Sequence, residues 1–385
     1  MPTRRLRVAA LIDTYEVFGA GRQLAPMGPA LRDHGVTHRV LLFHRAGRER
    51  PPYASYLDAL GADHVIVPEH GPADARVLKR TAAQLAAFDP DIVETHGYKP
   101  STIVATLRAV AAPRWSWLAF FHGGTTENAK VRAYNWIDRR AMSRADRLAV
   151  MSLAHREAFA HLGDRVRVVY NAVAELPAPN GAPTLRVREL FCPTPAADEV
   201  VLGVIGRLSS EKGVDVFLDA CRRLVDAGER FRAVIVGDGP DRMSLTARAA
   251  ALGLDACVAF AGTLRDVAQV YRQLTCVVIP SRSEGLPNVL LEALDHDLPV
   301  VATRVGAVPE VLTDPLAGVI VPPVDPDALA DGIRRAIALA RTPGAASARA
   351  STVRLFSLDA RVDAHLALYA ELADTIGVPV VAGAA

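Results

Sequence analysis

Ser281-Arg-Ser-Glu-Gly-Leu-Pro-Asn-Val-Leu-Leu-Glu-Ala-Leu294 follows the apolar run Cys276–Ile279 and joins a strand pattern to a helix pattern. The apolar run has the length of a buried strand, and the apolar residues after Pro287 recur at helical spacing. Gly285 and Pro287 lie between the two patterns and predict a tight loop. We expect Pro287 to be the first helical residue, because its fixed φ suits a helix start. The stretch therefore predicts a strand, a loop and a helix that opens just after Gly285.

The predicted helix start is suited to bind an anion. Its first backbone N–H groups have no partner within the helix, and Gly285 would let a ligand approach the backbone closely. Two carboxylates flank it, Glu284 in the loop and Glu292 about five residues into the helix, roughly 7–8 Å along the axis. Glu292 would accept hydrogen bonds from ribose hydroxyls, and Glu284 from a second sugar beyond the phosphates. The alternative for this pair is a capping acid and a solvated surface glutamate.

The same alternation of strand and helix patterns runs through the chain and is interrupted once. Residues 174–198 are rich in Pro and Ala, which indicates a linker or an insertion between residues 1–175 and a second domain over 200–355. Strands that alternate with helices predict parallel sheets covered on both faces. With 385 residues the chain is long for a single core. We therefore predict an α/β protein of two doubly wound, Rossmann-like domains, with a ligand site in the cleft between them.

Two cations fall in the first strand-to-helix loop of the second domain. Arg207 and Lys212 follow the strand pattern Val200–Ile205. This loop and the Glu284-Gly285 loop can converge at one edge of a parallel sheet, which would place both cations beside a helix N-terminus. Such a combination suits a diphosphate. Each cation alone has a simpler explanation as a surface charge, so the hypothesis depends on their joint placement with Glu284 and Glu292.

In the first domain, three residues occupy positions where α/β sheets bind ligands, at the carboxyl ends of strands. Gly19 lies in a Gly-x-Gly loop after the first predicted strand, although turn chemistry alone explains that motif equally well. His96 and His122 each end a strand pattern. A histidine at such a place is more often a hydrogen-bonded structural residue. His122 is the better candidate of the two, because two glycines follow it.

Several motifs of the predicted second domain resemble those of a known family. The set of Gly206-Arg207 with Glu211-Lys212-Gly213, Gly237-Asp-Gly-Pro240 and Pro280-Ser-x-x-Glu284-Gly-x-Pro-x4-Glu292 is similar to family 4 of the retaining glycosyltransferases (GT4), which have the GT-B fold. Two glutamates separated by seven residues are the signature of that family. The resemblance is specific over most of residues 200–340 and looser over 1–175.

This resemblance implies roles for individual residues. Arg207 and Lys212 would hold the donor diphosphate, and Glu292 the nucleotide ribose. Glu284 would contact the donor sugar, and the phosphate would meet the amides of Gly285, Leu286 and Asn288. His122 would lie near the transferred sugar, with Gly19 also on the donor side. Residues 356–385, with a helix over Leu358–Ile376, would form a tail that packs back on the first domain.

The resemblance also implies a reaction. A sugar would move from a nucleotide sugar to an acceptor hydroxyl with retention, through front-face attack in which the leaving phosphate takes the acceptor proton. No metal or other cofactor is expected. UDP is the favoured nucleotide, with GDP as the alternative, although no residue separates the bases. The acceptor would be a glycan, a lipid-linked sugar or a small molecule, as in bacterial glycan biosynthesis.

Other readings of the sequence remain open. A sugar phosphorylase or a nucleotide-sugar epimerase would use the same fold, and a lapsed enzyme would keep the nucleotide site as a binding or scaffold protein. Asp-x-Asp triplets at 89–91, 295–297 and 325–327 are of the kind that holds Mg²⁺ or Mn²⁺ in metal-dependent transferases. Their predicted places, before a strand, at a helix end and at a helix cap, favour structural roles for all three.

Charge is distributed unevenly along the chain. Residues 1–176 contain 24 Lys and Arg against 17 Asp and Glu, an excess of +7, whereas the whole chain carries +2. A basic first domain fits an anionic acceptor or peripheral contact with the inner face of a membrane, and an ordinary solvated surface is the simpler alternative. No apolar run is long enough to span a bilayer, and the short run after the basic N-terminus resembles a strand. We expect a cytoplasmic protein that does not bind nucleic acid.

Overall fold

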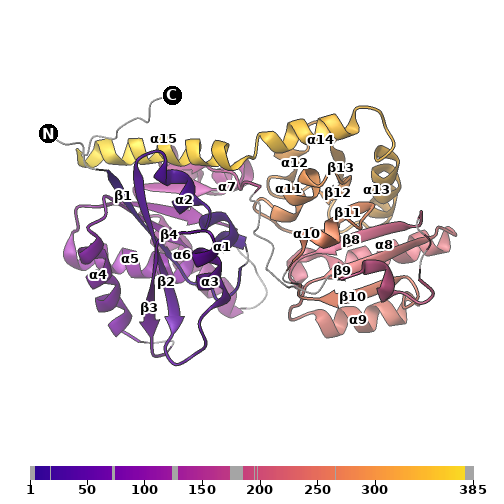
Figure 1. The fold of residues 1–385 in the computed structure, drawn as a ribbon, viewed down its shortest axis with the longest axis horizontal. Coiled ribbons are helices and arrows are strands. Elements are labelled where there is room, and N and C mark those ends of the chain that lie inside the picture. Colours follow the sequence, from indigo (N-terminus) through magenta and orange to yellow (C-terminus); the bar gives the residue numbers. More distant parts are fainter. Residues whose placement is uncertain are drawn as a thin grey trace. The chain divides into compact units, whose positions relative to one another are not determined.

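The computed structural model describes residues 5–17, 19–71, 74–123, 129–173, 185–194, 196, 198–264 and 266–377, with the side chains of 129–133 excepted. The chain divides into two compact units, one of residues 1–177 with 357–385 and the other of residues 178–356 (Figure 1). Of the predicted linker between residues 175 and 200, the structure describes residues 185–194, 196, 198 and 199.

The first unit is built on a parallel sheet. Its described strands have the order β3-β2-β1-β4-β5-β6-β7, and every neighbouring pair is parallel. The strands are β1 (Leu6–Ile12), β2 (Val36–Arg45), β3 (His64–Glu69), β4 (Ile92–His96), β5 (Ser116–Phe121), β6 (Arg147–Val150) and β7 (Val166–Val168). The order reverses between β1 and β4, which is where ligands bind in open α/β sheets.

Helices cover both faces of this sheet. One face packs on residues of α4 (Arg76–Phe88), α5 (Tyr98–Ala111) and α6 (Ala129–Met142). The other packs on α1 (Gly19–Leu24) and α3 (Pro52–Ala59), with α2 (Met27–Arg32) against β2. α7 (Leu153–Ala158) leads into a 3₁₀ helix, Ala160–Arg165. Ser152 caps α7 as its sequence predicts, accepting a hydrogen bond from the His155 amide at 3.0 Å.

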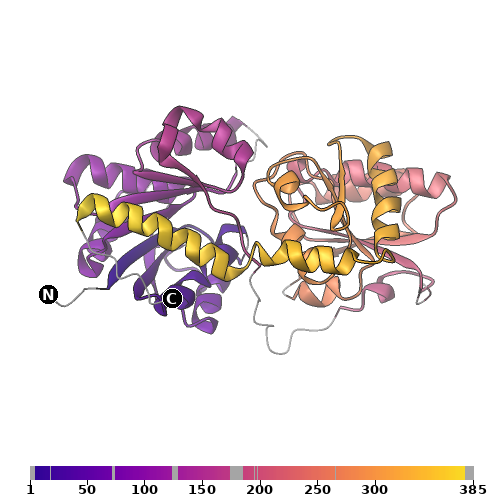
Figure 2. The ribbon, with the colours of Figure 1, turned by 90° about the horizontal axis from the view of Figure 1, so that it is seen from above.

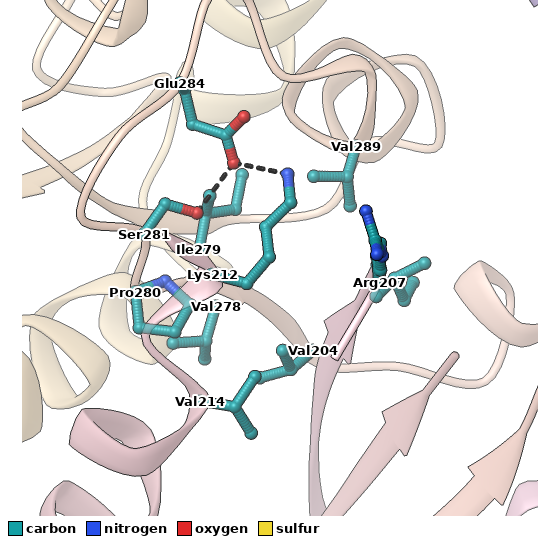
Figure 3. A pocket seen from close by; sticks show the side chains of 12 residues that line it. Val204, Arg207, Lys212, Val214, Val278, Ile279, Pro280, Ser281, Glu284 and Val289 are labelled. Atoms are coloured by element: carbon teal, nitrogen blue, oxygen red, sulfur yellow. Dashed lines mark hydrogen bonds and ion pairs between the residues drawn. The ribbon is translucent and has the colours of Figure 1, made fainter. Parts of the chain in front are cut away.

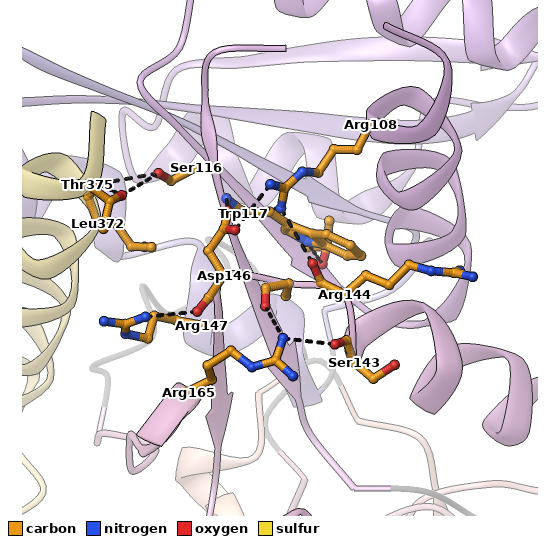
Figure 4. Close-up of polar contacts among 12 residues, drawn as sticks. Arg108, Ser116, Trp117, Ser143, Arg144, Asp146, Arg147, Arg165, Leu372 and Thr375 are labelled. Atoms are coloured by element: carbon orange, nitrogen blue, oxygen red, sulfur yellow. Dashed lines mark hydrogen bonds and ion pairs between the residues drawn. The ribbon is translucent and has the colours of Figure 1, made fainter. Parts of the chain in front are cut away.

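The last helix, α15 (Leu358–Ile376), belongs to the first unit although it follows the second in sequence. It packs against β4, β5 and α2, and Figures 1 and 2 show it running across that unit. Polar contacts hold it to the sheet: the Ser116 hydroxyl donates to the Leu372 carbonyl at 3.3 Å, and Arg147 pairs with Glu371 at 2.8 Å. Next to them Asp146 binds the Trp117 amide and the Arg108 guanidinium, as Figure 4 shows.

The second unit repeats the architecture. Its described strands have the order β10-β9-β8-β11-β12-β13, again all parallel. They are β8 (Val200–Ile205), β9 (Phe231–Val236), β10 (Val258–Gly262), β11 (Cys276–Ile279), β12 (Val300–Thr303) and β13 (Gly318–Val321). The order reverses between β8 and β11. The predicted α/β class with two parallel sheets is therefore confirmed.

The helices of the second unit complete its two outer layers. α8 (Val214–Asp226), α9 (Arg242–Ala251) and α13 (Pro326–Leu339) share the main core with the sheet. The remaining helices are α10 (Ala268–Tyr271), α11 (Asn288–Asp295), α12 (Val308–Val311) and α14 (Ala345–Arg354), with 3₁₀ turns at Val187–Leu190 and Ser210–Lys212. Within the described ranges no helix combines the length and apolar character needed to cross a membrane.

One helix prediction for the first unit is wrong in its bounds. The pattern from Leu24 to Leu31 predicts a single helix, but the structure has α1 and α2, with Pro26 between them. Pro26 lacks an N–H and its ring clashes with the preceding turn, so one continuous helix cannot pass through it. Gly19, predicted to lie in a loop, is the first residue of α1.

Candidate functional site

A pocket in the second unit lies where its sheet order reverses. It is formed by the carboxyl ends of β8 and β11 and by the loops that follow them, 206–213 and 280–287 (Figure 3). Ligands of open α/β sheets bind at this place. The pocket is lined by Val204, Ile205, Gly206, Arg207, Lys212, Val214, Val278, Ile279, Pro280, Ser281, Glu284 and Val289.

Glu284 is the centre of the polar contacts in this pocket. Its Oε1 accepts hydrogen bonds from Lys212 Nζ and from Ser281 Oγ, each at 2.7 Å. The Glu284 side chain is only 10% exposed, whereas Lys212 retains 27%. Arg207 lines the same pocket, as Figure 3 shows. The predicted convergence of the two loops is therefore seen in the structure, with Arg207, Lys212 and Glu284 around one cavity.

Ion pairing and backbone hydrogen bonds fix the two loops to each other. The Glu211 carbonyl accepts from the Arg282 amide at 2.7 Å, and the Arg282 guanidinium forms two hydrogen bonds with Asp215, at 2.7 and 2.6 Å. Asp215 lies in the first turn of α8. Arg282 opposes burial and lowers the pKa of Asp215 from its ordinary value, which keeps the pair charged. The spacing between Lys212 and Glu284 is thus set by contacts outside the pocket.

Two glycines allow these loops to approach closely. Gly213 has φ +63°, and a Cβ there would lie 2.1 Å from the Pro280 carbonyl oxygen. Gly306 has φ +53°, and a Cβ there would lie 2.3 Å from the Gly285 oxygen and 2.4 Å from that of Glu284. Neither distance is compatible with a side chain, and both φ values strain any L residue. A larger residue at Gly306 would displace the backbone that carries Glu284.

Helix α11 begins one residue later than predicted. Pro287 has φ −67° but an extended ψ of 122°, so it is the N-cap and Asn288 is the first helical residue. The Pro287 carbonyl already accepts from the Leu290 amide at 3.1 Å, as an N-cap carbonyl does. Gly285 and Leu286 are buried in the loop just before the cap. The three predicted phosphate-binding amides, those of Gly285, Leu286 and Asn288, therefore lie at one helix start.

Glu292 is not among the residues that line the pocket, although Val289, three residues before it on α11, is. Glu292 is the fifth residue of α11, and its Oε2 accepts a hydrogen bond from the Tyr271 hydroxyl at 2.6 Å. The Tyr271 ring also packs on His296, with ring centroids 4.9 Å apart. The structure thus gives Glu292 a tyrosine partner that holds its carboxylate. It does not bring Glu292 into contact with Glu284.

The first unit carries the other predicted residues. His122 directly follows β5, and its Nε2 lies 2.9 Å from Nδ1 of His96 at the end of β4. Burial lowers the pKa of His122 well below its ordinary value, with the positive charge of Arg361 acting in the same direction, so the ring is neutral at physiological pH. At Gly19 a Cβ would meet nothing within 4 Å. Nothing in the contacts of Gly19 points to a ligand.

Each Asp-x-Asp triplet has partners within the protein. Asp91 accepts from the Arg7 amide, Asp297 pairs with Arg349, and Asp325 caps α13. Asp89 ends α4 in a left-handed conformation, and Asp327 pairs with Arg223. Among the described residues no group of three or more His, Cys, Asp or Glu is placed to hold a metal ion.

Sequence profiles of two families match most of the chain. The profile described as "Glycosyltransferase Family 4" matches residues 17–175, and that described as "Glycosyl transferases group 1" matches residues 199–338. The chain belongs to glycosyltransferase family 4. The predicted resemblance is confirmed, and the pocket lies within the second matched region of this family 4 glycosyltransferase.

Curated relatives of this family 4 glycosyltransferase match it over part of their length. The α-D-kanosaminyltransferase of Streptomyces kanamyceticus is 33% identical over 140 residues, 36% of each chain. The D-inositol 3-phosphate glycosyltransferase of Saccharomonospora viridis is 36% identical over 188 residues, 46% of this chain and 43% of that one. The matches to these two span less than half of either relative.

Solved structures show the same fold over nearly the full chain. HepE from Anabaena, solved with UDP and glucose, has a TM-score of 0.77 at 18% identity and covers 95% of this chain and 100% of its own. Sucrose-phosphate synthase from Thermosynechococcus elongatus has a TM-score of 0.76 at 19% identity, with 96% and 100% covered. The fold of the family 4 glycosyltransferase is therefore GT-B, as predicted.

Some residues around the pocket had no clear signal in the sequence. Ser281 opens the stretch quoted above, but a serine after a strand is a common turn residue. Tyr271 lies in the four-residue helix α10, far from any motif. The closeness of Gly306 to Glu284 depends on how β12 leads back toward β11, which sequence spacing does not reveal.

Proposed function

We propose that the protein transfers a sugar from a nucleoside-diphosphate sugar to an acceptor hydroxyl. The observation that carries the proposal is the placement of Lys212, Arg207 and Glu284 around one pocket at the reversal point of the second sheet. Two cations suit the charge of a diphosphate, and a carboxylate that is largely shielded from solvent suits the hydroxyls of a sugar. Glu292, oriented by Tyr271, would take the ribose hydroxyls.

The reaction we propose proceeds with retention and without a metal. The bond from the anomeric carbon to the diphosphate breaks, and a new bond forms from that carbon to the acceptor oxygen on the same face. The acceptor proton passes to the leaving phosphate oxygen. Arg207, Lys212 and the amides at the start of α11 would stabilise the charge that develops on the diphosphate. His122 would contact the transferred sugar.

UDP is the nucleotide we favour, with GDP as the alternative. The support is indirect and comes from HepE of Anabaena, which shares the fold and was solved with UDP. The test is thermal unfolding with UDP, GDP, ADP and their sugars, with and without EDTA. A ligand at 100 times its Kd stabilises the protein by about 2.7 kcal/mol. A selective shift that survives EDTA supports the proposal, and product analysis then separates a transferase from a phosphorylase or an epimerase. No shift with any nucleotide contradicts it.

A second pocket, in the first unit, is our candidate for the acceptor. It lies at the carboxyl ends of β1, β2 and β3. Lys99 spans two of its carboxylates, Asp13 at 2.8 Å and Glu69 at 2.7 Å. The pocket is lined by Asp13, Thr14, Tyr15, Phe43, His44, Arg45, Arg48 and Glu69. This mixture of carboxylates, arginines and a stacked Tyr15–His44 pair suits a glycan, a lipid-linked sugar or a small polyol.

Peripheral membrane contact through the first unit is a further part of the proposal. Helix α6 exposes Trp136 by 66% and Ile137 by 39%, and it carries Arg139 and Arg140 in its last turn. Exposed aromatic residues beside arginines are typical of helices that lie at a lipid interface. Co-sedimentation with vesicles containing anionic lipid tests this, with Trp136→Ala expected to weaken binding. Absence of binding by the wild-type protein would rule it out.

A further inference from the structure

A buried polar cluster lies between the sheet of the first unit and helix α15. Glu94 on β4 is 1% exposed, and its Oε1 accepts a hydrogen bond from the Tyr369 hydroxyl of α15 at 2.7 Å. Its Oε2 faces two imidazoles, with His38 Nε2 at 3.6 Å and His96 Nε2 at 3.7 Å. Arg361 of α15 is also buried. Carboxylates and histidines are rarely buried together without a specific role or partner.

Strand geometry aligns this cluster with His122. Side chains two residues apart on a strand point to the same face, so Glu94 and His96 both face α15. Phe120 lies on the same face of β5 and stacks on the His96 ring, with centroids 4.7 Å apart. His122, two residues further, continues this face beyond the strand end. The three groups therefore form a row, Glu94 to His96 to His122, that runs from the core to the carboxyl edge of the sheet.

The contacts along this row determine where the protons lie. The 3.7 Å separation of His96 Nε2 from Glu94 Oε2 is longer than a hydrogen bond, and both atoms are buried without a hydrogen-bond partner. An ionised carboxylate can only accept hydrogen bonds and attracts an N–H, so we assign the proton of His96 to the Nε2 that faces it. A neutral His96 then has a bare Nδ1. The His96 Nδ1 to His122 Nε2 contact of 2.9 Å needs one donor, so the proton lies on His122 Nε2. A neutral His122 is left with a bare Nδ1, which is an acceptor.

The charges around the row favour these neutral rings. Burial opposes ionisation of Glu94, but His38, His96 and His365 outweigh it and hold the pKa of Glu94 well below its ordinary value. Burial lowers the pKa of His96 even though Glu94 raises it. The groups that face His122 are His96 from β4, His155 from α7 and Arg361 from α15, and none of them is an anion. Burial lowers the pKa of Arg361 to about 10 although Glu94 acts in the opposite direction, so Arg361 remains a cation near Glu94 at neutral pH.

We infer that Glu94, acting through His96, fixes the proton of His122 on Nε2 and leaves its Nδ1 to accept a hydrogen bond from a substrate hydroxyl. Glu94 and His96 are positioning residues, because both are buried, at 1% and 4% exposure. His122 is partly exposed at the carboxyl edge of the sheet, and it has no hydrogen bond to another described residue besides the one that its Nε2 donates to His96. The contact with a substrate rests on the proposed function. The proton positions do not.

Histidine NMR tests the proton positions directly. In the full-length protein labelled with ¹⁵N-histidine, two-bond ¹H–¹⁵N spectra distinguish the two neutral ring forms, and single His substitutions assign the signals. We expect His122 in the wild-type protein to be neutral near pH 7.5 with its proton on Nε2. In Glu94→Gln the amide no longer forces a proton onto His96 Nε2, so His122 should become a mixture of both forms. A proton on Nδ1 in the wild type, or an unchanged His122 in Glu94→Gln, overturns the inference.

A second variant, His96→Asn, tests the same inference if Glu94→Gln does not fold. His96→Asn retains a polar atom near the position of Nδ1 and loses the group that faces Glu94. In this variant, too, the proton of His122 should be distributed between Nε2 and Nδ1. Tyr369→Phe is the matched control, since it removes a hydrogen bond to the other oxygen of the same carboxylate but lies off the row. We expect His122 to keep its proton on Nε2 in that control.

Activity provides the functional readout. In serine proteases, loss of the carboxylate that orients the catalytic histidine lowers kcat by about 10⁴-fold, so we expect Glu94→Gln to lower kcat for transfer at least about tenfold. The KM for the donor should change less than about threefold, and Tyr369→Phe should stay within about threefold of wild type in kcat. Equal losses in both variants would overturn the positioning role. If the wild type transfers no sugar at all, the proposed function fails, whereas the NMR result still decides the proton positions.

Discussion

At the scale of single residues, the Lys212–Glu284 contact makes a sharp prediction. In the Glu284→Gln variant the side chain keeps an oxygen that can accept from the Ser281 hydroxyl. It loses the negative charge to which Lys212 Nζ donates at 2.7 Å. A hydrogen bond to a charged group contributes about 1.5–3 kcal/mol, so kcat/KM should fall about 10- to 150-fold. The melting temperature should change little. Asp219→Asn is the control, because it weakens an ion pair of α8, with Arg248, that involves neither of the two pocket loops. Equal kcat/KM for Glu284→Gln and wild type would remove Glu284 from the site.

His365 makes the stability of the first unit depend on pH. Burial, with the charge of Arg361, lowers the pKa of His365 from 6.5 to about 3. Between these values the unfolded chain binds a proton that the folded chain does not, so stability present above pH 6.5 is lost as the pH falls. The loss approaches 1.4 kcal/mol per pH unit, about 2 kcal/mol between pH 6.5 and 5. Urea unfolding at these pH values measures it, and His365→Gln should show a shallower dependence.

The control for this measurement is an exposed histidine of the same unit. His34→Gln should leave the pH dependence of stability as it is in the wild type. If His365→Gln and His34→Gln have the same pH dependence, His365 is not the source of the effect.

At the scale of elements, the turn after β12 supports the loop before α11. The Ala307 amide donates to the Gly285 carbonyl at 2.7 Å, and Gly306 leaves no room for a Cβ beside Glu284 and Gly285. Gly306→Ala should therefore move the loop and weaken nucleotide binding at least about tenfold. Gly228→Ala is the control, since its φ of +79° carries the backbone strain while a Cβ there meets nothing within 4 Å. Calorimetric titration with UDP would contradict the prediction if both variants bound equally.

Sequence patterns predict the bounds of helices and strands well where a single local preference decides them. The strand Cys276–Ile279 and the helix Leu358–Ile376 have the bounds expected from their apolar runs and caps. The helix expected from Leu24 to Leu31 is split, because Pro26 outweighs the apolar period. Pro287 fits either the cap or the first helical position by φ alone, and only ψ distinguishes them. Local rules fail where two of them compete at one residue.

At the scale of the whole molecule, removal of α15 tests how the first unit is completed. The helix buries Leu368, Tyr369 and Leu372 to 3% exposure or less, and burial of each such side chain contributes about 1.5–3 kcal/mol. The three tryptophans of the chain, at 115, 117 and 136, all lie in this unit, so their fluorescence reports on it alone. A chain ending at residue 356 should lose its cooperative tryptophan transition in urea. An unchanged transition would show that α15 is dispensable.

UDP binding is the control for that truncation. The nucleotide pocket belongs to residues 178–356, which the truncated chain retains, so calorimetry should show UDP binding like that of the full chain. Loss of both signals would mean that the truncation disrupts the whole protein.

The sequence predicts the candidate site better within one unit than across the molecule. Arg207, Lys212 and Glu284 are recognisable because strand-end loops of one parallel sheet converge at one edge. The row from Glu94 to His122 is not, since it depends on Arg361 and Tyr369 arriving from a helix more than 260 residues beyond β4. His96 and His122 are each noticeable at strand ends. Their contact becomes evident only when β4 and β5 are seen side by side.

Because α15 lies at the end of the sequence, it also determines when each unit can complete its fold during synthesis. The ribosome makes residues 1–177 first, then the entire second unit, and only then the helix that covers β4 and β5. At about 5–20 residues per second, the intervening residues 178–356 take roughly ten to thirty-five seconds. Throughout that interval Glu94 lacks its tyrosine partner, and an apolar face of the first sheet is open to chaperones and to other nascent chains. The unit that leaves the ribosome first is therefore the last to complete its fold.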